Sequence, residues 1–137
     1  MSVAVMAMRA GERAEVDAFY QAQLGRDVGL ELDQEVLVVR DSRDVVAALR
    51  LCPEAGTLVL RTVVVAEGRR GQGIGRSLLL EASKAIGRRE CWCFPWSYLD
   101  GFYGAIGFIR VPDPDVPPAL HHRRGSELIA TYRAATP

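Results

Sequence analysis

Thr57–Gly87 reads TLVLRTVVVAEGRRGQGIGRSLLLEASKAIG, and three patterns follow one another in it without a gap. The β-branched apolar run 63–65 predicts the end of a buried strand. The next residues, 67–72, include two adjacent arginines and the first of three closely spaced glycines, which is typical of a loop. From Gly73 the apolar residues recur at helical spacing, which predicts a helix that ends in a left-handed cap at Gly87.

A strand, a glycine-rich turn and a helix N-terminus in this order form an anion site. The first amides of a helix have no partners within the helix, and the helix dipole favours negative charge there. Glycines also allow the backbone to approach a phosphate closely. The residues therefore predict a ligand whose pyrophosphate lies on this turn, although glycines at an ordinary strand–loop–helix corner are the simpler alternative.

The spacing of the glycines excludes two common phosphate loops. A nucleotide-triphosphate loop needs GxxxxGK[ST], and no lysine and hydroxyl residue follow Gly73. A dinucleotide fingerprint needs GxGxxG, whereas Gly71, Gly73 and Gly75 form GxGxG and Leu78 stands where the third glycine should fall.

Two motifs resemble signatures of one family. Residues 70–75, RGQGIG, fit R-x-x-G-x-G and resemble the coenzyme A pyrophosphate signature of the GNAT superfamily of acetyl-CoA-dependent N-acetyltransferases. Residues 102–108, FYGAIGF, resemble the second GNAT signature, in which a tyrosine stands beside the thioester sulfur. The resemblance extends over residues 34–111 and is weak in the last part of the chain.

Length and composition set the broad class. The chain has 137 residues, which suits one domain over 1–137, and its 17 basic residues balance its 17 acidic ones, so no nucleic-acid or membrane partner is expected. Three cysteines form no C-x-x-C, no signal peptide or anchor is recognisable, and a cytoplasmic location is expected. His121 and His122 have no cysteine or carboxylate at ligand spacing, so no metal is expected.

The remaining patterns predict an α/β (α+β) domain. Close turns between apolar runs favour an antiparallel N-terminal meander, followed by a crossover helix and a strand parallel to 57–66. Pro95 closes that strand, so the two parallel strands either splay there or simply end. We expect strands at residues 3–8, 35–40, 45–52, 57–66, 91–94, 109–111 and 127–133, and helices at 11–24, 73–87 and 98–105. The resemblance implies the GNAT fold, with splayed parallel strands in a mixed sheet flanked by helices.

The resemblance also implies where acetyl-CoA binds. The backbone of Val63, Val64 and Val65 would bind the pantetheine arm, and an N–H near Val65 would stabilise the oxyanion. The pyrophosphate would lie on the turn, with Arg69 adding charge-assisted contacts and Arg88 and Arg89 either reaching outer phosphates or forming a solvated helix end. The turn residues in question are Arg70, Gly71, Gln72, Gly73, Ile74, Gly75 and Arg76.

The chemistry implied is direct attack of an amine on the thioester through a tetrahedral intermediate, with Tyr103 as the general acid for the departing thiolate. We expect the acceptor to be a primary amine of a small molecule, an amino acid or another amine-bearing compound. Thr62 stands where many members carry a basic glutamate, and Glu67 and Arg61 are the nearest charges, so the base is unassigned.

Three further points stay open at this stage. Trp96 and Tyr98 either line the acceptor pocket or only pack against neighbouring side chains. One helix stands between the first two expected strands, where the family usually has two, so the acceptor site is either open or completed by a second subunit in a homodimer. Two other functions also remain: a non-catalytic acyl-CoA-binding sensor or regulatory module, and an interaction protein that has lost its ligand.

Overall fold

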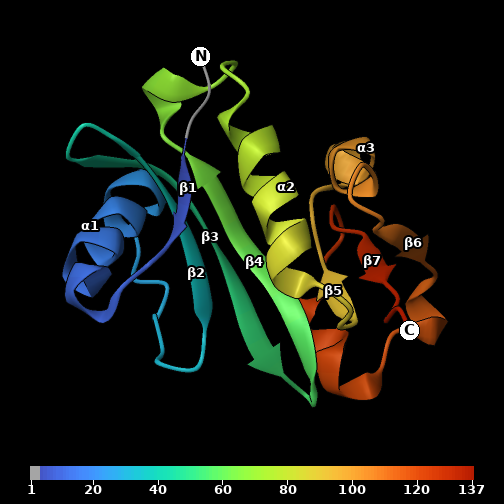
Figure 1. Cartoon of the computed structure of the whole chain (residues 1–137). Coiled ribbons are helices and arrows are strands. Elements are labelled where there is room, and N and C mark those ends of the chain that lie inside the picture. Colours follow the sequence, from blue (N-terminus) through green and yellow to red (C-terminus); the bar gives the residue numbers. More distant parts are fainter. Residues whose placement is uncertain (1–3) are drawn as a thin grey trace.

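The computed structural model describes residues 4–137 and contains one seven-stranded mixed sheet in the order β1-β2-β3-β4-β5-β7-β6 (Figure 1). The strands are β1 Val5–Ala7, β2 Glu35–Asp41, β3 Asp44–Glu54, β4 Thr57–Val65, β5 Cys91–Cys93, β6 Ile109–Val111 and β7 Ala130–Arg133. The α-helices are α1 Arg13–Leu24, α2 Ile74–Ile86 and α3 Asp100–Gly104, and short 3-10 turns are η1 Ala10–Glu12, η2 Glu67–Arg69, η3 Ser97–Leu99, η4 Asp113–Asp115 and η5 Pro118–Arg123.

The predicted antiparallel meander is confirmed over β1 to β4. Each strand pairs antiparallel with the next, and the β3–β4 turn has positive φ at both Ala55 (54°) and Gly56 (74°), as a tight hairpin turn requires. The first predicted strand began at Val3, which lies outside the described residues.

Two predicted elements had wrong boundaries, and one predicted helix cap had the wrong conformation. The strand expected at 127–133 is only β7, because Glu127 and Ile129 bond instead to the loop after β5, through Ser97 N–H and the Pro95 carbonyl. The helix expected at 98–105 is η3 followed by α3. Gly87 ends α2 with φ 60° and ψ −124°, a positive φ outside the left-handed helical region.

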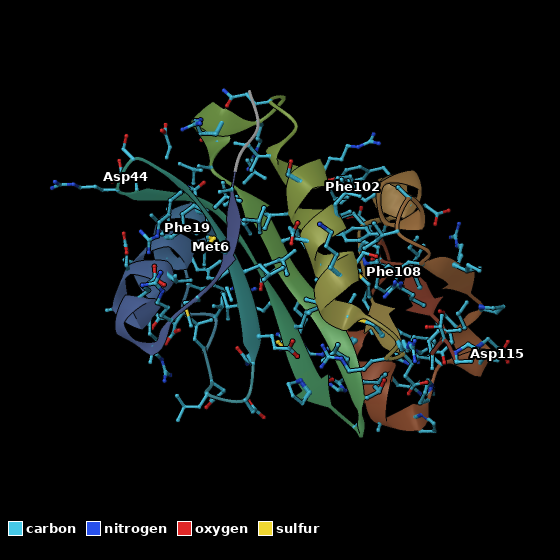
Figure 2. All side chains as sticks on the ribbon, in the orientation of Figure 1. Met6, Phe19, Asp44, Phe102, Phe108 and Asp115 are labelled. Atoms are coloured by element: carbon cyan, nitrogen blue, oxygen red, sulfur yellow. The ribbon has the colours of Figure 1, made fainter. Side chains whose placement is uncertain are left out.

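Helices cover both faces of the sheet. On one face α1 packs Val16, Phe19 and Tyr20 against β2 and β3, and on the other α2 packs its apolar side against β2, β3 and β4. Figure 2 shows the two sides, with Phe19 near α1 and Phe102 near α2 and α3. The alternation along the strands explains this arrangement, because successive side chains point to opposite faces. The larger core therefore lies beneath α2 and holds that helix, and the loop before it, against β4.

The parallel strands separate after two residue pairs. β5 pairs with β4 only at Val59↔Trp92 and Leu60↔Cys93, and it ends there while β4 continues to Val65. This is the splayed arrangement that the resemblance implied, whereas the sequence alone also left a simple strand end open. The last part of β4 keeps one edge without a partner strand.

A β-bulge interrupts β4 at the point of separation. Arg61 lies opposite Arg50 and Val64 lies opposite Ala48, so Thr62 and Val63 together face a single residue of β3. Thr62 has φ 50°, which is rare for a β-branched residue. Buried groups hold this conformation: the Tyr20 hydroxyl donates to the Thr62 carbonyl at 2.9 Å, and Arg50 Nε donates to Thr62 Oγ1 at 2.6 Å.

The position of α2 can be tested with two leucines of that helix. Leu78 is 0% exposed and Leu80 is 50% exposed. We expect Leu78→Ala to lower the free energy of unfolding by about 3 kcal/mol, because it removes buried apolar surface and leaves a cavity. The matched Leu80→Ala variant should lose less than about 1 kcal/mol. Urea unfolding followed by circular dichroism measures both, and equal losses would contradict the packing of α2 described here.

Candidate active site

The loop before α2 presents a row of free amides. Gly71 (φ 77°) and Gly73 (φ 80°) turn the chain in the left-handed region, and a Cβ on either would meet nothing within 4 Å. Among the described residues, none of the N–H groups from 71 to 76 donates to a backbone or side-chain acceptor, and the first helical bond at this end is from Ser77 to the Gly73 carbonyl. An open loop with unpartnered donors at a helix N-terminus fits a pyrophosphate.

Gly75 has a different role in the same loop. A Cβ there would lie 3.3 Å from Cζ of Phe102 and 3.7 Å from Cγ2 of Val65. The missing side chain therefore lets the first turn of α2 pack closely against both β4 and α3.

The arginines near the loop differ in their contacts. Arg70 Nε donates to the Val65 carbonyl at 3.3 Å, and Arg76 is exposed on the first turn of α2. Arg69 is held by Asp41 at 2.5 Å and by Gln72 at 3.1 Å.

Arg89 lies at the other end of α2, where it pairs with Glu35 at 2.7 Å and donates to the Ala85 carbonyl. A helix of 13 residues is roughly 20 Å long, so Arg88 and Arg89 are too far from the loop to bind a phosphate held there. Arg88 and Arg89 therefore form the solvated end of α2, the other alternative considered for them.

The end of β4 directs the backbone groups of Val65 into the gap left by β5. The Ala66 N–H donates to the carbonyl of Val46 in β3, so Ala66 and Val46 form a hydrogen-bonded pair. Bonded and non-bonded pairs alternate in an antiparallel ladder. Val65, opposite Ala47, is therefore in a non-bonded pair, and its N–H and carbonyl point away from β3.

A cleft of about 330 Å³ opens between the splayed strands. Thr62, Val63 and Val64 line it from β4, and Trp96 and Tyr103 line it from the segment after β5. Trp96 is 47% exposed, whereas Tyr98 is 79% exposed and is not part of the lining. Of the two aromatic residues considered for the acceptor pocket, only Trp96 lies at this cleft.

Tyr103 is buried around its ring and open at its hydroxyl. The residue is 6% exposed, its ring packs edge-on against Phe102 and Phe108, and its hydroxyl has no partner among the described residues. Burial, and to a lesser degree the Cys93 thiol, raises the pKa of Tyr103 well above its ordinary value. The phenol is therefore protonated at every physiological pH and can donate a proton into the cleft.

A second cavity lies beside the cleft, and the sequence reasoning missed it. A basic cavity of about 290 Å³ adjoins the cleft and shares five residues with it: Arg26, Leu60, Thr62, Phe94 and Leu128. Its charged lining comes from three distant segments and consists of Arg26, Arg61, His122, Arg123 and Arg124. We refer to it below as the basic pocket. A sign was present in the sequence, because Arg50 and Arg61 interrupt otherwise apolar strands and an HHRR run spans 121–124.

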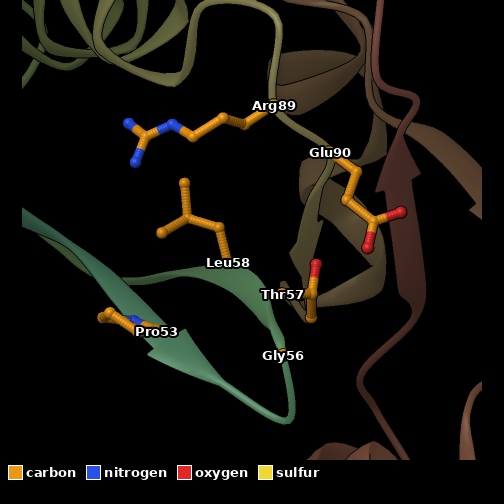
Figure 3. A pocket seen from close by; sticks show the side chains of 6 residues that line it. All are labelled: Pro53, Gly56, Thr57, Leu58, Arg89 and Glu90. Carbon is orange, nitrogen blue, oxygen red and sulfur yellow. The ribbon is translucent and has the colours of Figure 1, made fainter.

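Another cavity, at the opposite end of β4, has no comparable excess charge (Figure 3). Its two charged residues are already paired, Arg89 with Glu35 and Glu90 with the Tyr132 hydroxyl at 2.6 Å. Within residues 4–137, no group of three or more His, Cys, Asp or Glu side chains could hold a metal ion. Over the same range, no helix has the length and apolar character needed to cross a bilayer.

Comparison with known proteins agrees with this geometry. Residues 33–110, more than half of the chain, match the family model described as acetyltransferase (GNAT) domain. The chain belongs to the GNAT acetyltransferase family. This family transfers acyl groups from an acyl-CoA donor. A search of curated proteins by sequence gave no significant match.

Solved structures show the same GNAT fold at low identity. ElaA from Escherichia coli has a TM-score of 0.75 and 16% identity over 96% of this chain and 99% of its own. An acyl-CoA N-acyltransferase from Pseudomonas aeruginosa has a TM-score of 0.72 and 21% identity over 97% and 100%. An N-acetylglutamate synthase from Neisseria gonorrhoeae, crystallised with coenzyme A and N-acetyl-glutamate, has a TM-score of 0.71 and 13% identity over all of this chain and 36% of its own.

The loop can be tested by substitution at Gly73. We expect Gly73→Glu to abolish acetyl-CoA binding in calorimetry, because a carboxylate would fill and repel an anion from the site, and a side chain is strained at that positive φ. Gly56→Glu is the matched control, because Gly56 has φ 74°, equally open space and a position at the far end of β4. Unchanged affinity in a folded Gly73→Glu protein would show that the pyrophosphate lies elsewhere.

Proposed function

We propose that this protein is an N-acetyltransferase that moves the acetyl group of acetyl-CoA to a primary amine of a small molecule by direct attack through a tetrahedral intermediate. The observation that carries the proposal is that the free amides at 71–76 follow the end of β4, the strand that lines one side of a cleft bordered by Tyr103. The first feature suits the diphosphate of coenzyme A, and the second suits the reacting end of the same molecule.

Val65 and Tyr103 stabilise the two thioester atoms that gain negative charge, the carbonyl oxygen and the sulfur. When the amine attacks the carbonyl carbon, the carbonyl oxygen becomes negative, and the Val65 N–H, which points away from β3, is the donor available to it. When the carbon–sulfur bond breaks, the sulfur leaves as a thiolate. The Tyr103 hydroxyl donates to that thiolate and supplies its proton.

The attacking amine must lose a proton, and the cleft offers little for that purpose. Among the residues that line the cleft there is no carboxylate or imidazole, and Glu67 is exposed in η2 beyond the end of β4. We therefore assign the release of the proton to water and leave no side chain in the role of base.

The proposal is tested by incubating the protein with acetyl-CoA and a panel of small primary amines and following free thiol. Thiol release that depends on both the amine and the protein supports it. Saturable binding of acetyl-CoA with no turnover across the panel would instead favour an acyl-CoA-binding sensor, the alternative that the absence of a carboxylate in the cleft makes worth testing.

The role of Tyr103 can be separated from its packing. We expect Tyr103→Phe to lower kcat by ~10²- to 10³-fold, because only the proton donor is lost. The dissociation constant of acetyl-CoA should stay nearly constant, because the ring and its contacts are retained. Tyr132→Phe, which removes a hydroxyl bound to Glu90 outside the cleft, is the control and should leave kcat unchanged. Comparable losses of kcat and of affinity in Tyr103→Phe would mean that the hydroxyl is structural.

The raised pKa of Tyr103 predicts the shape of the pH profile. The rate should rise with pH as the amine acceptor loses its proton. A general acid with an ordinary tyrosine pKa of about 10 would then lose activity near that pH. Because the pKa of Tyr103 is raised, its proton is retained and we expect kcat/KM to stay level there. A fall of kcat/KM as the pH rises to about 10, absent in Tyr103→Phe, would contradict this expectation.

A further inference from the structure

The basic pocket beside the cleft has more positive charge than the protein itself neutralises. Glu54 is engaged by Arg123 at 2.5 Å and by His122 at 3.2 Å, and Asp113 lies 3.5 Å from Arg124. Arg26 and Arg61 have no ion pair with any described residue. No carboxylate lines the pocket within the described part of the chain.

A buried arginine behind the pocket adds to this imbalance. Arg50 is 0% exposed, and its only polar partners among the described residues are neutral: Thr62 Oγ1 at 2.6 Å and Gln34 Oε1 at 3.3 Å. Its Nη2 atom has no partner. A buried guanidinium with no counter-charge is costly to a folded protein, and so is a buried donor without an acceptor.

Arg50 and Arg61 also stand directly opposite one another on β3 and β4. Like charges in opposite positions of an antiparallel pair destabilise a sheet. Burial and the neighbouring guanidiniums of Arg123 and Arg50 lower the pKa of Arg61. Thr62, which Arg50 holds in the bulge, lines both the cleft and the basic pocket, so the excess charge borders the space next to the reacting centre.

We infer that the acceptor amine carries an anionic group, a carboxylate or a phosphate, and that Arg26 and Arg61 bind this group in the basic pocket while the amine enters the adjoining cleft. The inference rests on the proposed function for the identity of the reaction, but the anion site stands on its own geometry. An arginine fork binds either group through paired charge-assisted hydrogen bonds. An anion here would also supply the negative charge that Arg50 and Arg61 lack.

Turnover of matched acceptors tests the inference first. The first pair is an α-amino acid and its carboxamide, for example L-alanine and L-alaninamide, and the second is phosphoethanolamine and ethanolamine. We expect the anionic member of at least one pair to have a kcat/KM ~10-fold or more above its neutral partner. The carboxamide has the less basic amine, so a preference for the acid cannot arise from a larger neutral fraction. The pair that shows the preference identifies a carboxylate or a phosphate.

Substitution of Arg61 and Arg26 tests whether the preference for anionic acceptors arises from the basic pocket. Arg61→Gln and Arg26→Gln should lower kcat/KM for the anionic acceptor by ~10- to 100-fold, mainly through KM, and should leave the neutral acceptor and the affinity for acetyl-CoA nearly unchanged. Arg110→Gln, which removes an exposed arginine from edge strand β6, is the matched control and should change neither.

A binding measurement keeps the two proposals separable. N-acetyl-L-alanine and its carboxamide are titrated into the protein with coenzyme A present and absent, in the wild type and in Arg61→Gln. Tighter binding of the acid that Arg61→Gln removes supports the anion site, even if no amine releases thiol and the proposed reaction fails. Equal turnover within both acceptor pairs would overturn the anion site while leaving the acetyltransferase intact.

Discussion

The loss of the parallel partner of β4 after Leu60 is the constraint on which the rest of the structure depends. A central strand normally has both backbone edges bonded, and unpaired groups inside a protein are costly. Here β5 stops at Cys93 and the next residues turn away toward β7, so the edge of β4 from Arg61 to Val65 faces a cleft. Those backbone groups need a partner that is not a strand, and an extended ligand that runs along the edge meets that need.

Contacts on both faces of the sheet position this open edge of β4. The larger core fixes α2 against the sheet, and Gly75 allows its first turn to touch β4 and Phe102, so the free amides of the loop are held at the end of the cleft. On the opposite face, Tyr20 and Arg50 hold the bulge at Thr62. A ligand that binds the loop with its diphosphate and the strand edge with its arm therefore presents its reactive end beside Tyr103 and the basic pocket.

Local patterns were enough to predict much of this arrangement. The apolar run, the R-x-x-G-x-G loop and the periodic helix predicted the strand, loop and helix found at 57–86, and the resemblance implied the separation of the parallel strands that Pro95 alone left open. The basic pocket could not be predicted in the same way, because Arg26, Arg61 and the 121–124 run come together only through the tertiary fold. The shortened β7 was missed for a similar reason: residues 127–129 bond to the loop after β5, and sequence periodicity does not report such contacts.

The most direct test of the central claim is an amide chemical-shift titration of the isotope-labelled protein with acetyl-CoA, which suits a chain of 15.0 kDa. If the diphosphate binds the main chain between β4 and α2, the largest shifts will fall on the amides of residues 71–76, with Val65 following as the arm lies along the strand edge. Shifts that leave these amides unmoved and gather elsewhere on the protein would contradict the account.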